Sequence, residues 1–591
     1  MSMINDKTTY FNDDDDYTPK PYSLLISHGM TTYFQQQLEA LLGVAAYDMR
    51  GVQRVDYPDD KNISVDCGAY AVIDAKVQDQ KLVKRLFVSR GLNVIMGDGT
   101  YIGQSFYTPF SWLGDALEYI RTVRENNVPG AKDAEFEIFV ASGTYKPRRR
   151  RADAHTVSGG VTDQRQNSFS VPYNVKIYGG FSGYETYCSH EDGGSYSPAG
   201  VDGTLSFVDI TGYEAEKIKE DILDKREYSD YNGNNILEPW EMAHGTILSG
   251  AIDMEGNEQN TYHVLYSDRG TSTGDPETQS VTLDGLTVMN GKTKDFLYSE
   301  TGGDDNSEVG RGAGLYSNGV DYKIVNCRFM DNEAVRGGGI YVRNGNLTSI
   351  NSAFAGCSTV DDKSGNAAGG GVYMAVIGTA TEPIGTFRAV NTIFVNNTSV
   401  GTGGAIHVAG GSVDLMNNTI VSNKTATGPV INSDANKKVK MVNTLLWNNK
   451  SDSGSDSTIP GAVDITYSAS DIDYNDLFAA GNTWHNFKLV SDNMDLSGPR
   501  FANPNMQVGA VNYNPVSNWN PIAQSPLTDT GNGKVSPDGS DYTQDATYVG
   551  DAQAYRDWFK QYAEEYISDY MGNADYLRYS GPLKDDGTAD S

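Results

Sequence analysis

One segment of the sequence has the residue spacing of a calcium-binding loop. It reads DYNGNNILEPWE, and its oxygen donors would be Asp230, Asn232, Asn234, the backbone carbonyl of Ile236 and Glu241. Oxygens at these positions suit a hard cation in the twelve-residue loop frame. Asn235 stands where the frame has its turn glycine, and Pro239 interrupts the exiting helix. We predict a structural calcium ion here, with an acidic turn shaped by Asn and Gly as the alternative.

A second set of residues could bind a sugar. Four glycine-rich blocks, GAGLY, GGGIY, GGGVY and GGAIH, each end in an aliphatic residue followed by a ring, and these rings are Tyr316, Tyr341, Tyr373 and His407. If the aliphatic residue points inward, the ring points outward, because side chains alternate along a strand. An exposed ladder of rings would suit the apolar faces of sugars, and Arg343 could reach an acidic glycan. The long insertions could instead bury the rings, and burial is slightly favoured.

Catalytic residues are not evident in the same region. Uronate elimination needs a Lys or Arg base, usually with calcium held by clustered carboxylates, and hydrolysis needs a carboxylate pair. The acidic residues of the repeats lie at different phases, and so do the arginines; examples are Asp321, Asp331, Asp414, Arg328, Arg343 and Arg388. We therefore predict no catalytic residue, and the sequence leans against an enzyme.

These candidates lie in a repeat that must position them. The repeated unit is an Asn, a bulky apolar residue three positions later and usually another Asn after three more, in copies that begin at Asn326, Asn351, Asn391, Asn417 and Asn443. An earlier, degenerate copy begins at Asp284, and the base period is about 25 residues with two insertions of roughly 15. Such a period predicts an all-β parallel β-helix, in which coils stack at about 4.8 Å. The sequence lacks the frame of leucine-rich repeats, and propeller blades are longer.

Stacking predicts which side chains form columns. The aliphatic residues of the glycine blocks should form an inward column of Leu315, Ile340, Val372 and Ile406. The central residues of the Asn units should fill the core beside it, namely Phe329, Phe354, Phe394, Ile420 and Leu446. The asparagines should form a ladder in which side-chain amides bond from coil to coil at a bend.

The glycine block followed by N-x-x-F-x-x-N resembles a known class of repeats. It is similar to the right-handed, single-stranded parallel β-helix repeats of bacterial surface proteins, including polymorphic outer-membrane adhesins and pectin-lyase-like proteins. Flanking segments such as IFVASGTYKP, SFSVPYNVKIYGGFSGYET and VTLDGLTVMNG look like a subfamily common in gut Bacteroidetes. The resemblance covers roughly residues 84–535. It implies the fold and leaves activity open, because one fold hosts many functions.

Helical caps are expected at both ends, because a solenoid must cover its terminal coils. Residues 110–126 place Trp112, Ala116, Leu117, Ile120 and Val123 on one helical face, and residues 551–572 carry aromatic residues at helical spacing. The predicted division is a segment of unknown fold at 1–83, the capped β-helix at 84–500, and a closing segment with the amphipathic helix at 501–591.

Charge and cysteine content limit the partners. The 591 residues carry 77 acidic and 46 basic side chains, for a net charge of −31, which repels nucleic acid and anionic membranes. The four cysteines lie in no metal-ligand spacing, and no apolar window is long enough to span a bilayer. The acidic run at 13–16 resembles tracts that follow the lipidated Cys of Bacteroidetes surface lipoproteins, although no such Cys precedes it. The run is either such a tract, in a chain whose signal peptide has been removed, or a solvated flexible tail.

The functional prediction is an exported cell-surface β-helix protein that acts in binding or adhesion. One form of this prediction is a lipid-anchored protein of the outer membrane. Its expected partners are polysaccharide or cell-surface glycan and other surface proteins, with no nucleic acid. The alternatives are a polysaccharide lyase or glycoside hydrolase of the same fold, and a structural subunit of a surface or particle assembly.

Overall fold

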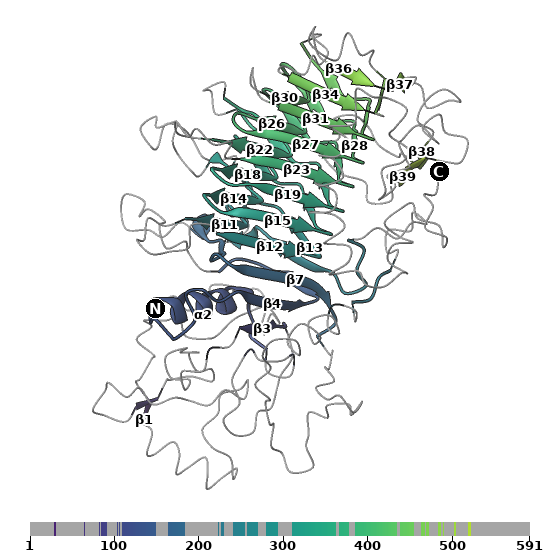
Figure 1. Cartoon of the computed structure of the whole chain (residues 1–591). Coiled ribbons are helices and arrows are strands. Elements are labelled where there is room, and N and C mark those ends of the chain that lie inside the picture. Colours follow the sequence, from purple (N-terminus) through teal and green to yellow (C-terminus); the bar gives the residue numbers. More distant parts are fainter. Residues whose placement is uncertain are drawn as a thin grey trace, which may run out of the picture. The chain divides into compact units, whose positions relative to one another are not determined.

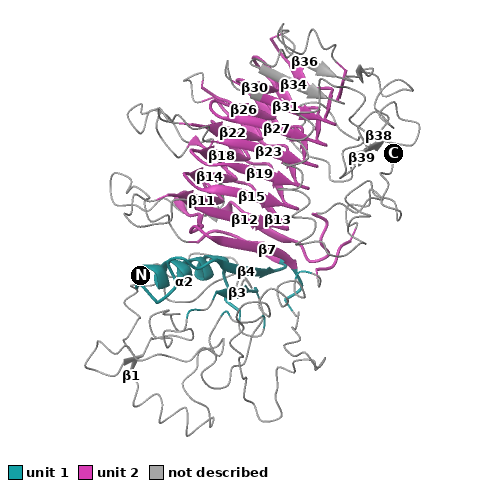
Figure 2. Cartoon of the chain, in the orientation of Figure 1, with its two compact units in different colours: residues 1–142, 181–225, 253–258 teal, residues 143–180, 226–252, 259–591 magenta. Residues whose placement is uncertain are grey.

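The structure is a computed structural model. It describes, with short gaps, residues 82–90, 103–148, 164–183, 223–229, 240–269, 279–293, 310–361, 366–376, 385–433 and 438–453, together with strand segments at 29–30, 64–65, 462–471, 483–489, 501–503 and 518–521. The chain forms two compact units (Figure 2), unit 1 at 1–142, 181–225 and 253–258, and unit 2 at 143–180, 226–252 and 259–591. No helix in the described part is long and apolar enough to cross a membrane.

Unit 1 contains the first predicted cap helix. α2 (Leu113–Glu125) lies against the parallel pair β3 (Arg85–Val88) and β4 (Phe136–Ala141). Ala116, Leu117, Ile120 and Val123 are buried on one face of the helix, and Trp112 is buried at its N-cap, as the spacing predicts. That the helix covers an end of the solenoid remains a prediction, and residues 551–572 lie outside the described residues. A short antiparallel pair joins β1 (Gly29–Met30) to β2 (Ser64–Val65).

Unit 2 is a parallel β-helix built from three parallel sheets (Figure 1). Sheet 1 contains, in spatial order, β7 (Val175–Phe181), β12 (Ser280–Asp284), β15 (Asp321–Val325), β19 (Leu347–Ile350), β23 (Thr386–Val390), β27 (Ser412–Met416), β31 (Lys438–Val442), β34 (Ala462–Thr466) and β36 (Thr483–His485). Sheet 2 contains β5 (Gly143–Tyr145), β8 (Thr246–Ser249), β13 (Leu286–Met289), β16 (Arg328–Met330), β20 (Ala353–Ala355), β24 (Ile393–Val395), β28 (Thr419–Val421), β32 (Leu445–Trp447), β35 (Ala469–Ser470) and β37 (Lys488–Leu489).

Sheet 3 completes each coil. It contains β6 (Phe169–Ser170), β11 (Leu265–Asp268), β14 (Leu315–Asn318), β18 (Ile340–Arg343), β22 (Val372–Ala375), β26 (Ile406–Val408) and β30 (Ile431–Ser433). A narrow fourth sheet contains β17 (Glu333–Ala334), β21 (Ser358–Thr359), β25 (Thr398–Ser399), β29 (Lys424–Thr425) and β33 (Lys450–Ser451). The remaining elements are η1 (Gln164–Gln166), the pair β9 (Ala251–Met254) and β10 (Asn257–Asn260), and the antiparallel pair β38 (Phe501–Asn503) and β39 (Asn518–Pro521).

The register confirms the predicted core columns. Leu315, Ile340, Val372 and Ile406 are consecutive partners in sheet 3, and all four are fully buried. In sheet 2, the rings of Phe329, Phe354 and Phe394 stack at centroid distances of 5.5 and 4.9 Å, followed by Ile420 and Leu446. The predicted all-β parallel β-helix is therefore confirmed from its strand pairing.

The glycine blocks form the turns that enter sheet 3. Gly312, Gly337, Gly369 and Gly403 have φ between 65° and 72°, the left-handed region that other residues avoid. A Cβ at Gly337 would also collide with the carbonyl oxygen of Ile340. Glycine is therefore required at this position both by conformation and by the close approach of the chain.

The predicted asparagine ladder forms at two positions of the repeat: Asn391 Nδ2 donates to Asn351 Oδ1 at 3.2 Å, and a second ladder lies at the last Asn of the unit. The first Asn of each unit, such as Asn351 or Asn391, takes a left-handed conformation with φ of 47° to 53° at the bend between sheets 1 and 2. The coil-to-coil bonds come mainly from the last Asn, where Asn397 Nδ2 donates to Asn423 Oδ1 and Asn423 Nδ2 donates to Asn449 Oδ1, both at 3.0 Å. Asn tolerates the left-handed region and also pairs buried backbone groups, so both positions select it for different reasons.

We call the column formed by the last Asn of each unit the inner ladder. Cysteine replaces asparagine at one position of this ladder. Asn397 and Asn423 each donate to the carbonyl of the preceding coil, at Phe354 and Phe394, at 2.9 Å. At the equivalent rung the Cys357 thiol points to the Phe329 carbonyl at 3.3 Å. Cys357 and Cys327 are free thiols, and burial raises the pKa of each to about 12. Cys357 therefore takes the place of a polar rung in this ladder, whereas the Cys327 sulfur accepts from the backbone N–H of Leu286.

Candidate functional site

The predicted ring ladder exists and is longer than expected. The rings of Tyr266, Tyr316, Tyr341, Tyr373 and His407 lie on successive strands of sheet 3 and are nearly parallel, with centroid separations of 5.1, 5.6, 5.3 and 4.7 Å. The parallel register, which pairs Tyr316 with Tyr341 and Tyr373 with His407, holds them in one column. His263 contacts the first two rings from the side.

The ladder is buried, so the favoured expectation of burial is confirmed and the alternative, an exposed sugar-binding surface, is wrong. Tyr316 and Tyr341 are 0% and 1% exposed, and Tyr373 and His407 are each 8% exposed. The guanidinium of Arg311 lies 5.5 Å from the ring centroid of Tyr341, and that of Arg336 lies 5.9 Å from that of Tyr373. These arginines come from the chain that enters each glycine turn, where positions 311, 336, 368 and 402 pair in register. Cation–π contact with this column closes the outer face of the rings.

His407 ends the ladder in a neutral form. Its Nδ1 lies 2.9 Å from Asn432 Nδ2 and 3.1 Å from Thr402 Oγ1. Because the Asn432 amide nitrogen can only donate, Nδ1 accepts and the ring proton is on Nε2. Burial, with the nearby positive charge of Arg336, lowers the pKa of His407 to about 4. The ring is therefore uncharged at neutral pH and is part of the packing.

Arg343 lies away from the rings. It is the last residue of β18, in the column that pairs Asp268 with Asn318 and Asn318 with Arg343, and it is partly exposed. Asn318 Nδ2 donates to Asp268 Oδ1 at 2.8 Å. A ligand-binding role for Arg343 remains a prediction, although the ladder no longer supports it.

Of the predicted calcium ligands, only the last lies in the described part of the chain. Asp230, Asn232, Asn234 and Ile236 lie outside the described residues, whereas Glu241 is described and fully buried. Within the described part of the chain, no group of three or more His, Cys, Asp and Glu residues could hold a metal ion. Bound calcium in this loop remains a prediction.

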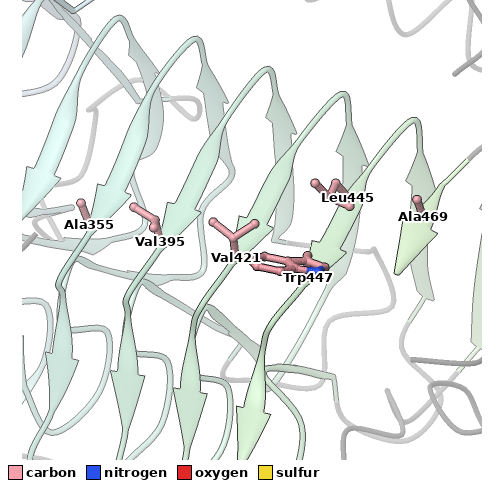
Figure 3. Close-up of a cluster of buried hydrophobic side chains, with 6 residues drawn as sticks. All are labelled: Ala355, Val395, Val421, Leu445, Trp447 and Ala469. Atoms are coloured by element: carbon pink, nitrogen blue, oxygen red, sulfur yellow. The ribbon is translucent and has the colours of Figure 1, made fainter. Parts of the chain in front are cut away.

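The outward face of sheet 2 is apolar and buried. Ala355, Val395, Val421, Leu445, Trp447 and Ala469 form one cluster across β20, β24, β28, β32 and β35 (Figure 3), and each is at most 8% exposed. These residues flank the inward positions Phe354, Phe394, Ile420 and Leu446 in the same strands. The outward faces of sheets 2 and 3 therefore present little polar surface at their centres.

The outward face of sheet 1 is different, because two of its columns are polar. The first column pairs, strand by strand, Lys176, Thr282, Lys323, Thr348, Arg388, Asp414 and Lys440. All of these are partly exposed except Thr348, which is 8% exposed. We call this the cation column.

A second column, the amide–hydroxyl column, runs two residues away on the same face. Its members are Ser280, Asp321, Asn346, Thr386 and Ser412. Asn346 links its neighbours, because its backbone N–H donates to Asp321 Oδ1 and its Oδ1 accepts from the Thr386 N–H. Side chains two apart lie on one face of a strand, so the two columns form one polar band along the coils.

The two polar columns were missed by sequence reasoning although a signal exists. Each member of the cation column from Lys323 to Lys440 stands three residues before the first Asn of its unit. The signal is weak because the column mixes Lys, Thr, Arg and Asp, so no single residue type repeats at this phase. Arg388 belongs to this column, whereas Arg328 lies in sheet 2 and Arg343 in sheet 3.

Comparison with known proteins gives the following matches. No family model matches the sequence, and no curated protein matches it. Among solved structures, a polygalacturonase from Erwinia carotovora ssp. carotovora is 11% identical, with 70% of this chain and 96% of that chain covered and a TM-score of 0.27. Tailspike protein 3 of bacteriophage CBA120 is 8% identical, with 63% and 52% covered and a TM-score of 0.19. A mutant tailspike of E. coli bacteriophage HK620, in complex with a pentasaccharide, is 9% identical, with 77% and 84% covered and a TM-score of 0.13.

At these identities the fold assignment rests on the chain's own strand pairing. Three parallel sheets, wound once per repeat, define a parallel β-helix. The candidate functional site within it is the polar band on the outward face of sheet 1.

Proposed function

We propose that the protein binds polysaccharide at the cell surface, as an exported adhesion or binding protein, through the polar band of sheet 1. The observation that carries the proposal is the strict register of that band, in which polar side chains, all partly exposed in the cation column except Thr348, repeat from β7 to β31. A ligand that repeats along its own length can meet the same kind of donor at each strand spacing of about 4.8 Å.

The side-chain chemistry supports an extended, hydrated ligand. Hydroxyl, amide and ammonium groups offer directional hydrogen bonds to sugar hydroxyls, and no single one needs to bind tightly. Weak contacts held on one rigid scaffold add up, because each further contact becomes intramolecular once the first has formed. A polymer is therefore a better match to this face than a small molecule.

Binding is favoured over catalysis by the state of the carboxylates in the polar band. Asp321 accepts from the backbone N–H of Asn346 at 2.8 Å, and Asp414 lies 3.5 Å from the guanidinium of Arg388. An active site beside the ring ladder would need exposed rings, and the tyrosines are buried. The proposal therefore assigns the face to recognition.

The test is retention on immobilised polysaccharides, neutral and acidic, with and without calcium, while new chain ends are measured. We expect retention without cleavage. The double variant Thr282→Val and Thr348→Val removes two hydroxyls at nearly constant shape. It should weaken retention by about thirtyfold, since each hydrogen bond contributes roughly 1 kcal/mol and about 1.4 kcal/mol corresponds to a factor of ten.

The matched control is Thr419→Val, which makes the same change at a partly exposed position on sheet 2. It should leave retention unchanged. Equal losses in both variants would remove sheet 1 as the binding face, and release of new reducing or unsaturated ends would replace binding by the lyase or hydrolase alternative.

A further inference from the structure

Basic side chains recur at every second strand of the cation column. The strands β7, β15, β23 and β31 carry Lys176, Lys323, Arg388 and Lys440, whereas the strands between them carry Thr282, Thr348 and Asp414. The alternation covers seven consecutive strands of sheet 1. It therefore gives the polar band a second, longer period of two coils.

The longer period has a definite length. Two strand spacings of about 4.8 Å place neighbouring cations about 10 Å apart along the stack. The four cations are partly exposed, so their charged ends reach solvent while their stems lie on the sheet. An extended chain of pyranose sugars advances by roughly one strand spacing per sugar, so the cation period corresponds to a disaccharide.

We propose that the ligand is an anionic polysaccharide in which acidic and neutral sugars alternate, lying along sheet 1 with one acidic group at each cation. This inference rests on the proposed function and specifies its ligand class. Lysine and arginine both pair with carboxylate or sulfate groups, and Thr282 and Thr348 offer hydroxyls to the neutral sugars between them.

Asp414 adds selectivity against a uniformly charged polymer. It occupies a strand between two cations and lies 3.5 Å from Arg388 and next to Lys440 in the register. A polymer with an acid on every sugar would place a negative group against Asp414, and like charges in contact are unfavourable. A polymer with alternating acids places a neutral sugar there.

The acidity of the whole chain does not oppose this binding at physiological salt. The net charge of −31 is spread over 591 residues, and the Debye length at 0.15 M is about 8 Å. Charges farther away than that are largely screened, so nearby charges, among them the column's cations, Asp321 and Asp414, act most strongly on a bound chain. Asp321 is itself bonded to Asn346.

The experiment compares three soluble probes, dextran as a neutral chain, polygalacturonate with an acid on every sugar, and hyaluronan with an acid on every second sugar. The full-length protein should bind hyaluronan most tightly. The double variant Lys323→Gln and Lys440→Gln should lose about threefold to tenfold in affinity for hyaluronan, because exposed ion pairs contribute up to about 1 kcal/mol each. Lys450→Gln, an exposed lysine of the narrow fourth sheet, is the control and should change nothing.

The outcomes separate the two proposals. If none of the probes and no other polysaccharide is retained, the proposed function fails. If dextran binds as well as hyaluronan and the double lysine variant is unaffected, binding stands and the charge inference fails. Preference for polygalacturonate over hyaluronan overturns the spacing argument. Asp414→Asn should narrow the gap between these two polymers, and an unchanged gap would overturn the selectivity role of Asp414.

Discussion

At the scale of residues, the ring ladder shows how an outward position becomes part of the packing. Strand alternation places Tyr341 opposite the inward Ile340, yet the ring is as buried as the core because Arg311 and the neighbouring rings cover it. Alternation fixes the direction of a side chain and does not determine what covers it. Arg311 stands just before the glycine turn of its coil, so its cover over a ring of the next coil follows from three-dimensional stacking alone.

His407 makes the stability of this ladder sensitive to pH. The pKa of His407 is lowered from 6.5 to about 4 in the folded protein, whereas the unfolded chain takes up a proton near pH 6.5. Stability should therefore fall as the pH falls from 6.5 to 4, by about 3 kcal/mol in total, and the loss is complete below the lower value. The variant His407→Gln should lack this component.

The measurement is the free energy of unfolding in urea at several pH values, compared between the protein and the variant. Asp331, whose pKa burial raises to about 6, titrates in the same window with the opposite sign, and it contributes equally to both proteins. The difference between their slopes therefore isolates His407. Parallel pH profiles, or an NMR titration of the His407 ring with a midpoint near 6.5, would contradict the prediction.

At the scale of elements, the inner asparagine ladder joins the bend of each coil to the next. Asn423 donates to the Phe394 carbonyl and to Asn449, and its Oδ1 accepts from the backbone N–H and the side chain of Asn397. All of these groups except Asn449 are in the buried part of the bend. The ladder therefore satisfies polar groups that no strand pairing reaches.

Replacing Asn423 with Leu should destabilise the protein strongly. The change leaves the Asn397 N–H and the Phe394 carbonyl without a partner inside the core, and each such group costs about 1–3 kcal/mol. The expected loss in the free energy of unfolding in urea is therefore about 2–6 kcal/mol. Asn417→Gly removes an exposed asparagine of the same coil from a left-handed position that glycine tolerates, and it should cost little. Similar losses in both variants would show that the amide bonds are not the cause.

Part of this arrangement could be predicted from the sequence. The spacing of Ile340, Phe354 and the glycine turns was sufficient to predict coils, core columns and register, because each repeats with the same period. It did not show which Asn of a unit faces inward, since two different physical needs select the same residue type. The polar band could also be predicted in principle. Its members differ in residue type, however, and share only their position in the repeat relative to Asn351 and its equivalents.

At the scale of the whole molecule, the large negative net charge should affect stability. The net charge of −31 opposes compaction, because like charges lie closer together in the folded chain than in the unfolded one. Each coil of unit 2 contacts mainly the coils before and after it. The packing of side chains between adjacent coils, rather than one central core, must therefore offset this repulsion. Salt should therefore stabilise the protein.

We expect the thermal unfolding midpoint at pH 7 to rise as sodium chloride is raised from about 0.01 to 0.15 M, which shortens the Debye length from about 30 to 8 Å. The control is the same titration near the isoelectric point of about 4.5, where the net charge is close to zero and the rise should largely disappear. A comparable rise at both pH values would indicate specific ion binding rather than screening. A midpoint that falls with salt at pH 7 would mean that attractive ion pairs, such as the buried pair of Arg226 and Asp284 at 2.9 Å and the exposed pair of Lys424 and Asp452, outweigh the net repulsion.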